Sequence, residues 1–197
     1  MNNAALYKRS NTLQRRDAKQ VLDEYAHLMQ WRPDETDSLL DIGCGSGDVT
    51  IDYILPILPK KFSRLVGCDL SEQMVHHARD TFQSGKISFE QIDISSANLI
   101  KRAHLDTFDH ITSFYCLHWV ENQKQAVYNI SNLLKKNGDC LLAFLAKNPI
   151  FDIYKELAKS NKWSEYMYDV NRFISPYQYS KNAADEFGKL LYGAGFT

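Results

Sequence analysis

The chain has 197 residues, a formal net charge of −1, 44% hydrophobic residues and 24% charged residues. This length fits one domain with a sizeable core, and the near-zero charge gives no general attraction to nucleic acid or to an anionic membrane. No apolar run is long enough to cross a bilayer, and the first residues lack the apolar segment of a signal peptide, so we expect a cytoplasmic protein.

The first half of the chain alternates helical and extended patterns. Apolar residues at helical spacing predict a helix over 12–30, and a turn-rich break follows at 31–37. The segment 38–42 reads as a short buried strand. A helix is predicted over 46–58, with Pro56 and Pro59 at its end, and then a strand over 64–70.

The second half continues the alternation. Ser71 is a good N-cap for a helix over 72–82, and strands are predicted over 86–93 and 108–114. A helix over 121–134 is expected to stop at Asn137-Gly138, before a strand over 139–146. Further helices are predicted near 149–160, 162–173 and 180–193. Strands that alternate with helices favour an open, mostly parallel α/β sheet with helices on both faces.

The four cysteines, Cys44, Cys68, Cys116 and Cys140, lie far apart, and no C-x-x-C pair indicates a zinc or redox site. Each lies in or beside an apolar run. We therefore expect reduced, mostly buried thiols, as is typical of a cytoplasmic protein, and no metal site.

A glycine cluster, "LLDIGCGSGDVT" over 39–50, lies between the first strand and the next helix. Glycine allows backbone angles that other residues resist, and it has no side chain to keep a ligand away. Asp69 and Asp93 end the second and third strands. Because ligands of open α/β sheets bind at the carboxyl ends of the strands, these residues predict a small-molecule site.

The spacing is G-x-G-x-G, whereas a dinucleotide-binding loop has G-x-G-x-x-G. Asp48 occupies the place of the third glycine and brings a carboxylate towards the expected pyrophosphate, which disfavours a nicotinamide or flavin cofactor. Asp41 beside the loop suits a ligand with a positive amine. S-adenosylmethionine has such an amine and a cationic sulfonium.

The segment "LLDIGCGSG" resembles motif I of the class I S-adenosylmethionine-dependent methyltransferases. The resemblance implies a Rossmann-like fold, in which the glycine loop lines the methionine part of the cofactor. It also implies that Asp69 holds the ribose hydroxyls and that Asp93 meets the adenine amino group. The implied cofactor-binding residues are Asp41, Gly43, Cys44, Gly45, Gly47, Asp69, Leu70, Asp93 and Ile94.

A closer resemblance covers nearly the whole chain. The segments "MNNAALYKRSNTLQRRDAKQVLDEYAHLMQW", "SFYCLHWV", "CLLAFLA" and "FISPYQYS" look like the juvenile hormone acid O-methyltransferases of insects. That family methylates the carboxylate of juvenile hormone acid or farnesoic acid. The resemblance implies that Gln14 and Trp119 are the catalytic residues that hold this carboxylate. It divides the single domain into an N-terminal helical cap (1–34), a cofactor-binding core (35–147) and a helical substrate cap (148–197).

The chemistry agrees with these residue types. A carboxylic acid is ionised at neutral pH, so it needs no general base, and neutral donors such as Gln14 and Trp119 orient it without holding it too tightly. Without the resemblance, Gln14 reads as an exposed helix residue and Trp119 as packing. His118 reads as structural or pocket-lining rather than as a base, and Tyr7 and Tyr115 are candidate pocket residues.

An apolar acyl chain needs an apolar pocket, which the aromatic-rich segment 148–179 could help form, with core packing as the equal alternative. The sequence ends at "LLYGAGFT". The resemblance implies that the sixth and seventh strands of the sheet are missing, so the edge of the fifth strand could associate with a second copy.

Two other functions stay open at this point. One is a catalytically silent protein that binds S-adenosylmethionine, and the other is a methyltransferase for another small apolar carboxylic acid.

Overall fold

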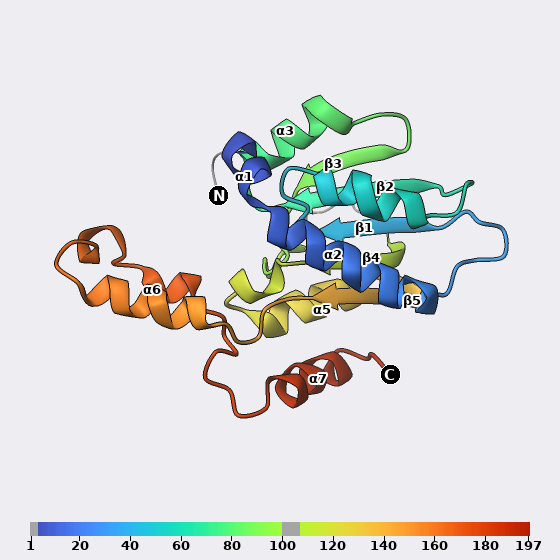
Figure 1. The fold of residues 1–197 in the computed structure, drawn as a ribbon. Helices are drawn as coiled ribbons and strands as arrows, with labels where there is room; N and C mark the ends of the chain where they lie inside the picture. Colours follow the sequence, from blue (N-terminus) through green and yellow to red (C-terminus); the bar gives the residue numbers. More distant parts are fainter. Residues whose placement is uncertain (1–3, 100–106) are drawn as a thin grey trace.

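The computed structural model describes residues 4–99 and 107–197 (Figure 1). Its centre is one parallel sheet with the strand order β3-β2-β1-β4-β5. The strands are β1 (Ser38–Ile42), β2 (Arg64–Asp69), β3 (Ile87–Gln91), β4 (Phe108–Phe114) and β5 (Leu134–Ala143). The order reverses between β1 and β4, and this arrangement opens a crevice at the carboxyl ends of the strands. The predicted open parallel sheet is confirmed.

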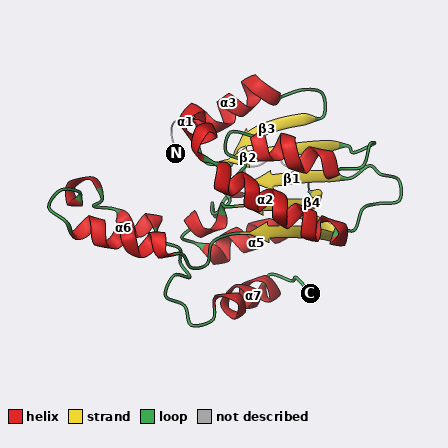
Figure 2. Cartoon of the chain, in the orientation of Figure 1, coloured by secondary structure: helices red, strands yellow, loops and turns green. Residues whose placement is uncertain are grey.

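Helices cover both faces of the sheet (Figure 2). They are α1 (Ala4–Ser10), α2 (Thr12–Tyr25), α3 (Glu72–Phe82), α5 (Gln123–Leu133), α6 (Pro149–Lys159) and α7 (Ala183–Gly193). Short helical segments are η1 (Ala26–Leu28), η2 (Thr50–Ile54), η3 (Leu55–Ile57), η4 (Leu117–Trp119), η5 (Ser164–Tyr166) and η6 (Val170–Phe173).

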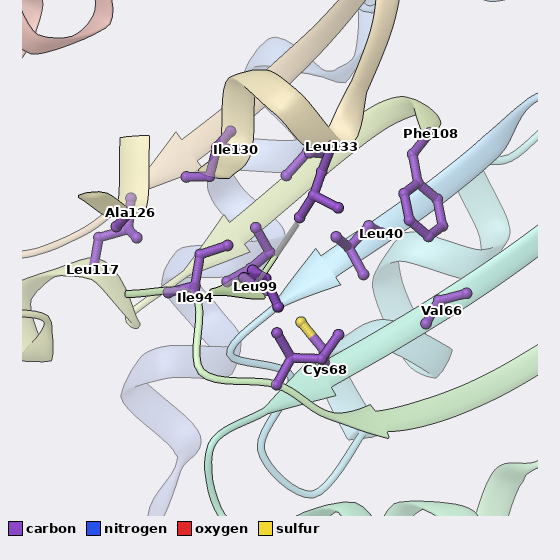
Figure 3. Close-up of a cluster of buried hydrophobic side chains, with 13 residues drawn as sticks. Leu40, Val66, Cys68, Ile94, Leu99, Phe108, Leu117, Ala126, Ile130 and Leu133 are labelled. Carbon is purple, nitrogen blue, oxygen red and sulfur yellow. The ribbon is translucent and has the colours of Figure 1, made fainter. Parts of the chain in front are cut away.

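Neighbouring residues of β1 show how the two faces are filled. Leu39 packs with Ala18 and Leu22 of α2, whereas Leu40 packs with Ile130 of α5. Because side chains alternate along a strand, α2 and α5 lie on opposite faces. Figure 3 shows the cluster on the α5 side, which includes Leu40, Val66 and Ile130. The segments η2 and η3 share the α2 side, since Ile54 belongs to the same cluster as Leu39.

Three element predictions differ from the structure. The helix over 12–30 ends at Tyr25, and η1 follows it, while the sequence pattern missed α1 altogether. The predicted helix over 162–173 is wrong, because this stretch forms the short turns η5 and η6. Its aromatic side chains Tyr166 and Tyr168 are 74% and 86% exposed, so they do not supply the buried apolar face that a longer helix would need.

The boundary predicted at Asn137-Gly138 is also wrong. Helix α5 ends at Leu133, and β5 begins at Leu134 with a shift in its register against β4. Asn137 keeps the positive φ of 65° that its position suggested. Here, however, it lies in an irregular part of the strand rather than at a helix end.

After β5, α6 and the turns η5 and η6 project away from the sheet (Figure 1). Phe151 of α6 is fully buried, and its ring contacts Trp119 and His118. Within residues 4–99 and 107–197, no helix is long and apolar enough to cross a membrane.

Candidate functional site

The glycine loop turns sharply after β1, at the carboxyl edge of the sheet. Gly43, Gly45 and Gly47 have φ angles of 78°, 54° and 82°, a region that other residues rarely adopt. A Cβ at Gly43 would lie 2.3 Å from the Cβ of Cys116. The N–H groups of Gly43 and Cys44 both donate to the Cys68 carbonyl oxygen, which fixes the loop against β2.

Asp69 lies at the end of β2, directly beside this loop. Its Oδ2 accepts a hydrogen bond from the Gly45 N–H at 3.0 Å, and its Oδ1 accepts one from the Ser71 N–H at 2.8 Å. Leu70 is 65% exposed. The structure therefore brings Asp69, Leu70 and the loop together at one edge of the sheet.

Asp93 and Ile94 follow β3. The Asp93 carboxylate is exposed and accepts hydrogen bonds from the N–H and hydroxyl of Ser95. The Ile94 side chain is only 5% exposed and belongs to the core cluster of Figure 3. An adenine contact of Ile94 stays a prediction, and its side chain has little surface to offer.

Asp41 is 2% exposed and carries no cationic partner among the contacts described for it. Thr50 donates to its Oδ2 at 2.5 Å, and Thr112 donates to its Oδ1 at 3.0 Å. Thr112 is the residue that pairs with Asp41 across β1 and β4, so the sheet register places this donor. Burial raises the pKa of Asp41 to about 6, against the lowering effect of the two hydroxyl groups.

This pKa predicts a pH-dependent affinity for a cationic ligand. Only the ionised carboxylate attracts a positive amine, so lowering the pH from 7.5 to 5 should weaken binding of S-adenosylhomocysteine about tenfold. Calorimetric titration at several pH values measures this. In Asp41→Asn, binding should be weaker at pH 7.5 and should depend little on pH. A slope that persists in this variant would assign the titration to another group.

A first pocket opens between the loop and the N-terminal helices, with an empty volume of about 330 Å³. Its lining residues are Tyr7, Gln14, Asp41, Gly43, Cys44, Asp48, Val49 and Phe114. The Tyr7 ring covers the loop, since a Cβ at Gly45 would lie 3.2 Å from it. Burial, followed by the charge of Asp48, raises the pKa of Tyr7 to about 12, so its hydroxyl stays protonated.

Gln14 is the residue of the first pocket with an unsatisfied group. Its Oε1 is buried and has no hydrogen-bond partner. A buried polar atom without a partner is costly unless a ligand or water completes it. Because Gln14 lies beside Asp41 and Gly43 in the pocket lining, this oxygen indicates that a ligand group that donates a hydrogen bond belongs here.

Asp48 is compensated in a way that the sequence did not reveal. Its Oδ2 accepts hydrogen bonds from Asn11 at 2.9 Å and from Arg15 at 2.6 Å, and Ser46 donates to its Oδ1. Burial raises the pKa of Asp48, but these hydrogen bonds outweigh it, and the pKa lies below its usual value. The expected repulsion between Asp48 and a pyrophosphate is therefore weaker than the sequence suggests.

Trp119 and His118 lie on η4, after β4. Trp119 is 43% exposed and packs edge-on against Phe151 and Phe173. It does not line the first pocket, so the structure does not place it beside Gln14 there. His118 is 1% exposed, and burial lowers its pKa to about 4. Its Nδ1 accepts a hydrogen bond from the Leu145 N–H at 3.4 Å, which favours a neutral ring with Nε2 protonated.

Tyr115 leads to a second pocket, with an empty volume of about 450 Å³. Its lining comes from α2 (Asp17, Ala18, Val21), the end of β4 (Phe114, Tyr115) and the end of β5 (Ala143, Phe144, Leu145). Tyr115 has a φ of 56°, and its hydroxyl donates to Asp17. Sequence reasoning missed Asp17, although its position three residues after Gln14 puts both on one helix face.

Comparisons with known proteins agree with this geometry. The methyltransferase domain family matches residues 40–140, which include the glycine loop and Asp69. The chain of a solved complex between the Haloferax volcanii Trm112 methyltransferase activator and a methyltransferase has a similar fold. That similarity has a TM-score of 0.62 and 20% identity, and it covers 99% of this chain and 76% of that chain. Fold and loop together define a class I S-adenosylmethionine-dependent methyltransferase.

Two curated relatives narrow the class. The juvenile hormone acid O-methyltransferase of Drosophila melanogaster is 51% identical over 100% of this chain and 66% of its own length. The enzyme of the same name from Bombyx mori is 44% identical over 100% of this chain and 69% of its own length. The chain belongs to the juvenile hormone acid O-methyltransferase family. It spans about two thirds of the length of these relatives.

Proposed function

We propose that the protein transfers a methyl group from S-adenosylmethionine to the carboxylate of juvenile hormone acid or farnesoic acid and forms the methyl ester. The relatives carry this activity in their names, and the chain supplies the glycine loop and the acidic positions that the cofactor needs. The observation that carries the proposal is the set of groups that meet in the first pocket: the buried Asp41 carboxylate, the glycine loop at Gly43 and the unpaired Gln14 Oε1, which can accept a hydrogen bond from the cationic amine of the cofactor.

The residues present fit the cofactor. Asp41 offers a buried carboxylate to the cationic amine, the loop from Gly43 to Gly47 offers close backbone approach, and Asp69 offers a charged acceptor to ribose hydroxyls. Leu70 is exposed next to Asp69 and can pack against the ligand. The roles of Asp93 and Ile94 at the adenine rest on the family resemblance.

In this proposal Gln14 and Trp119 hold the substrate carboxylate through their N–H groups, as the family resemblance implies. His118, Tyr7 and Tyr115 are the further candidates for contact with the substrate. When bound, S-adenosylmethionine supplies the methyl group from its sulfonium, whose C–S bond breaks as the C–O bond of the ester forms. No proton has to move, because the acid is already ionised. A neutral His118 is consistent with a reaction that needs no general base, because its Nδ1 already accepts a hydrogen bond from the Leu145 N–H. The protein's contribution is placement and exclusion of water.

Removing Gln14 tests the assignment. In Gln14→Ala, kcat/KM for farnesoic acid should fall about 10–100-fold, because a hydrogen bond to a charged group is lost. The affinity for S-adenosylhomocysteine should change less than about twofold. The matched control is Gln20→Ala, which removes an exposed glutamine from the same helix, and its kinetics should equal those of the wild type. An equal loss of cofactor affinity in Gln14→Ala would instead indicate a folding role.

We also propose a cytoplasmic location and self-association through β5. All four cysteines are free, as is typical of a reducing compartment. β5 ends the strand order of the sheet, and no further strand of the described chain pairs with it. Such an edge can add a strand from a second copy, which sedimentation analysis at several concentrations would detect.

A further inference from the structure

The first and second pockets lie next to each other and share Phe114. Helix α2 runs past both. Gln14 lines the first pocket, and Asp17, Ala18 and Val21 line the second. These positions follow the spacing i, i+3, i+4 and i+7, so they form one stripe of the helix. The distance along the helix from residue 14 to residue 21 is about 10 Å, at a rise of about 1.5 Å per residue.

The second pocket has the composition of a site for an apolar chain. Ala18, Val21, Ala143 and Leu145 contribute apolar side chains, as is usual for the lining of a small-molecule pocket. Its polar groups are paired with each other, because the Tyr115 hydroxyl donates to Asp17. Burying an alkyl chain here would therefore leave neither of these groups without a partner.

Charge decides which end of an amphipathic acid enters the second pocket. The hydrogen bond from Tyr115 lowers the pKa of Asp17, so Asp17 is ionised at neutral pH. Asp17 then repels a carboxylate in the second pocket. In the first pocket, Gln14 presents a neutral amide, Asp48 is compensated by Arg15, and in the proposed function Asp41 is compensated by the cationic amine of the bound cofactor.

We propose that the second pocket holds the apolar chain of the substrate whose carboxylate lies at Gln14, and that Val21 and Ala143 limit the length of that chain. This inference rests on the proposed function. It replaces the expectation that the segment 148–179 forms the chain site, because no residue beyond Leu145 lines either pocket.

The test is a series of unbranched carboxylic acids of four to twelve carbons, titrated by calorimetry in the presence of S-adenosylhomocysteine. For the wild type, each added methylene should tighten binding about fourfold until the pocket is full. Val21→Phe and Ala143→Leu fill the second pocket, so the gain in binding affinity per methylene should stop at a shorter chain. Dodecanoic acid should bind them about 15-fold more weakly, equivalent to two methylenes, while butanoic acid should bind as to the wild type.

Ala184→Leu on the exposed side of α7 is the matched control, and its chain-length dependence should equal that of the wild type. An unchanged dependence in both filled variants would overturn the inference, and so would an equal loss for short and long acids.

Methyl transfer is measured separately. In one outcome, the affinity of the filled variants stops rising at a shorter chain, but the wild type transfers no methyl group to any acid. The second pocket is then a site for the apolar chain, and the proposed function fails. If transfer occurs and the filled variants bind every acid as the wild type does, the chain pocket alone fails.

Discussion

Gly43→Ala should destabilise the protein by roughly 2–5 kcal/mol and abolish measurable binding of S-adenosylhomocysteine. Two costs add. A residue with a Cβ at a φ of 78° loses about 1–2 kcal/mol, and crowding in a packed site costs about 1–3 kcal/mol. The crowding is severe, because the new Cβ would lie 2.3 Å from the Cβ of Cys116. Urea unfolding gives the first quantity and calorimetry the second.

Two further variants separate these costs. Gly85 also has a positive φ, 49°, but a Cβ there would meet nothing within 4 Å. Gly85→Ala should therefore show only the backbone cost and keep its ligand affinity. In the double variant Gly43→Ala, Cys116→Gly, the facing Cβ is gone, so part of the lost stability and affinity should return. If Gly43→Ala and Gly85→Ala were equally mild, close packing of the loop against Cys116 would be refuted.

His110→Ala should lower the free energy of unfolding by about 3–5 kcal/mol, the cost of breaking a buried ion pair on one side. His110 is 1% exposed, and its two ring nitrogens lie 2.9 Å from Asp37 and 2.6 Å from Asp139. Without the ring, two carboxylates lose their shared partner. In the control His76→Ala, the exposed histidine pairs with Asp80 at 3.3 Å, and the change should stay within about 0.5 kcal/mol. A loss below about 1 kcal/mol in His110→Ala would contradict the charged arrangement.

The same site makes stability depend on pH. Burial opposes the charged form of His110, but the hydrogen bonds to Asp139 and Asp37 outweigh it and raise its pKa above 6.5. The folded state therefore holds this proton more tightly than the unfolded state does. The stabilisation is fully present below about pH 6.5 and is lost as the pH rises through the folded-state pKa. Urea unfolding between pH 5.5 and 9 should show this loss in the wild type and not in His110→Ala.

The sequence alone determined the parallel sheet and the glycine loop. The apolar strands alternate with amphipathic helices, and this local periodicity fixes each element almost independently of the rest. Gly43 and its neighbours were identifiable because glycine adopts such backbone angles without the steric cost that other residues carry. The acidic residues at the carboxyl ends of β2 and β3, Asp69 and Asp93, followed from chain order, since parallel strands end at the same edge of the sheet.

Local patterns failed where a segment depends on distant contacts. The stretch 162–173 has helical spacing, but most of its side chains stay exposed, and it remains as short turns. The end of α5 was misplaced because β5 begins as soon as Leu134 can pair with Phe108 of β4. Strand pairing with β4 therefore ends α5 before the chain reaches Asn137-Gly138, where the sequence pattern had predicted the helix end.

Only the tertiary structure decided how α2 packs on one face of the sheet, with its N-terminal turns at the carboxyl ends of β1 and β4. That placement pairs Arg15 with Asp48 and Tyr115 with Asp17, and it turns Gln14 into the first pocket. These contacts join residues 33 to 98 positions apart, and no spacing rule specifies them. Charge compensation and pocket shape depend on the packing of segments that are distant in the sequence. The conformation of the glycine loop depends on neighbouring residues, so the sequence alone predicts it.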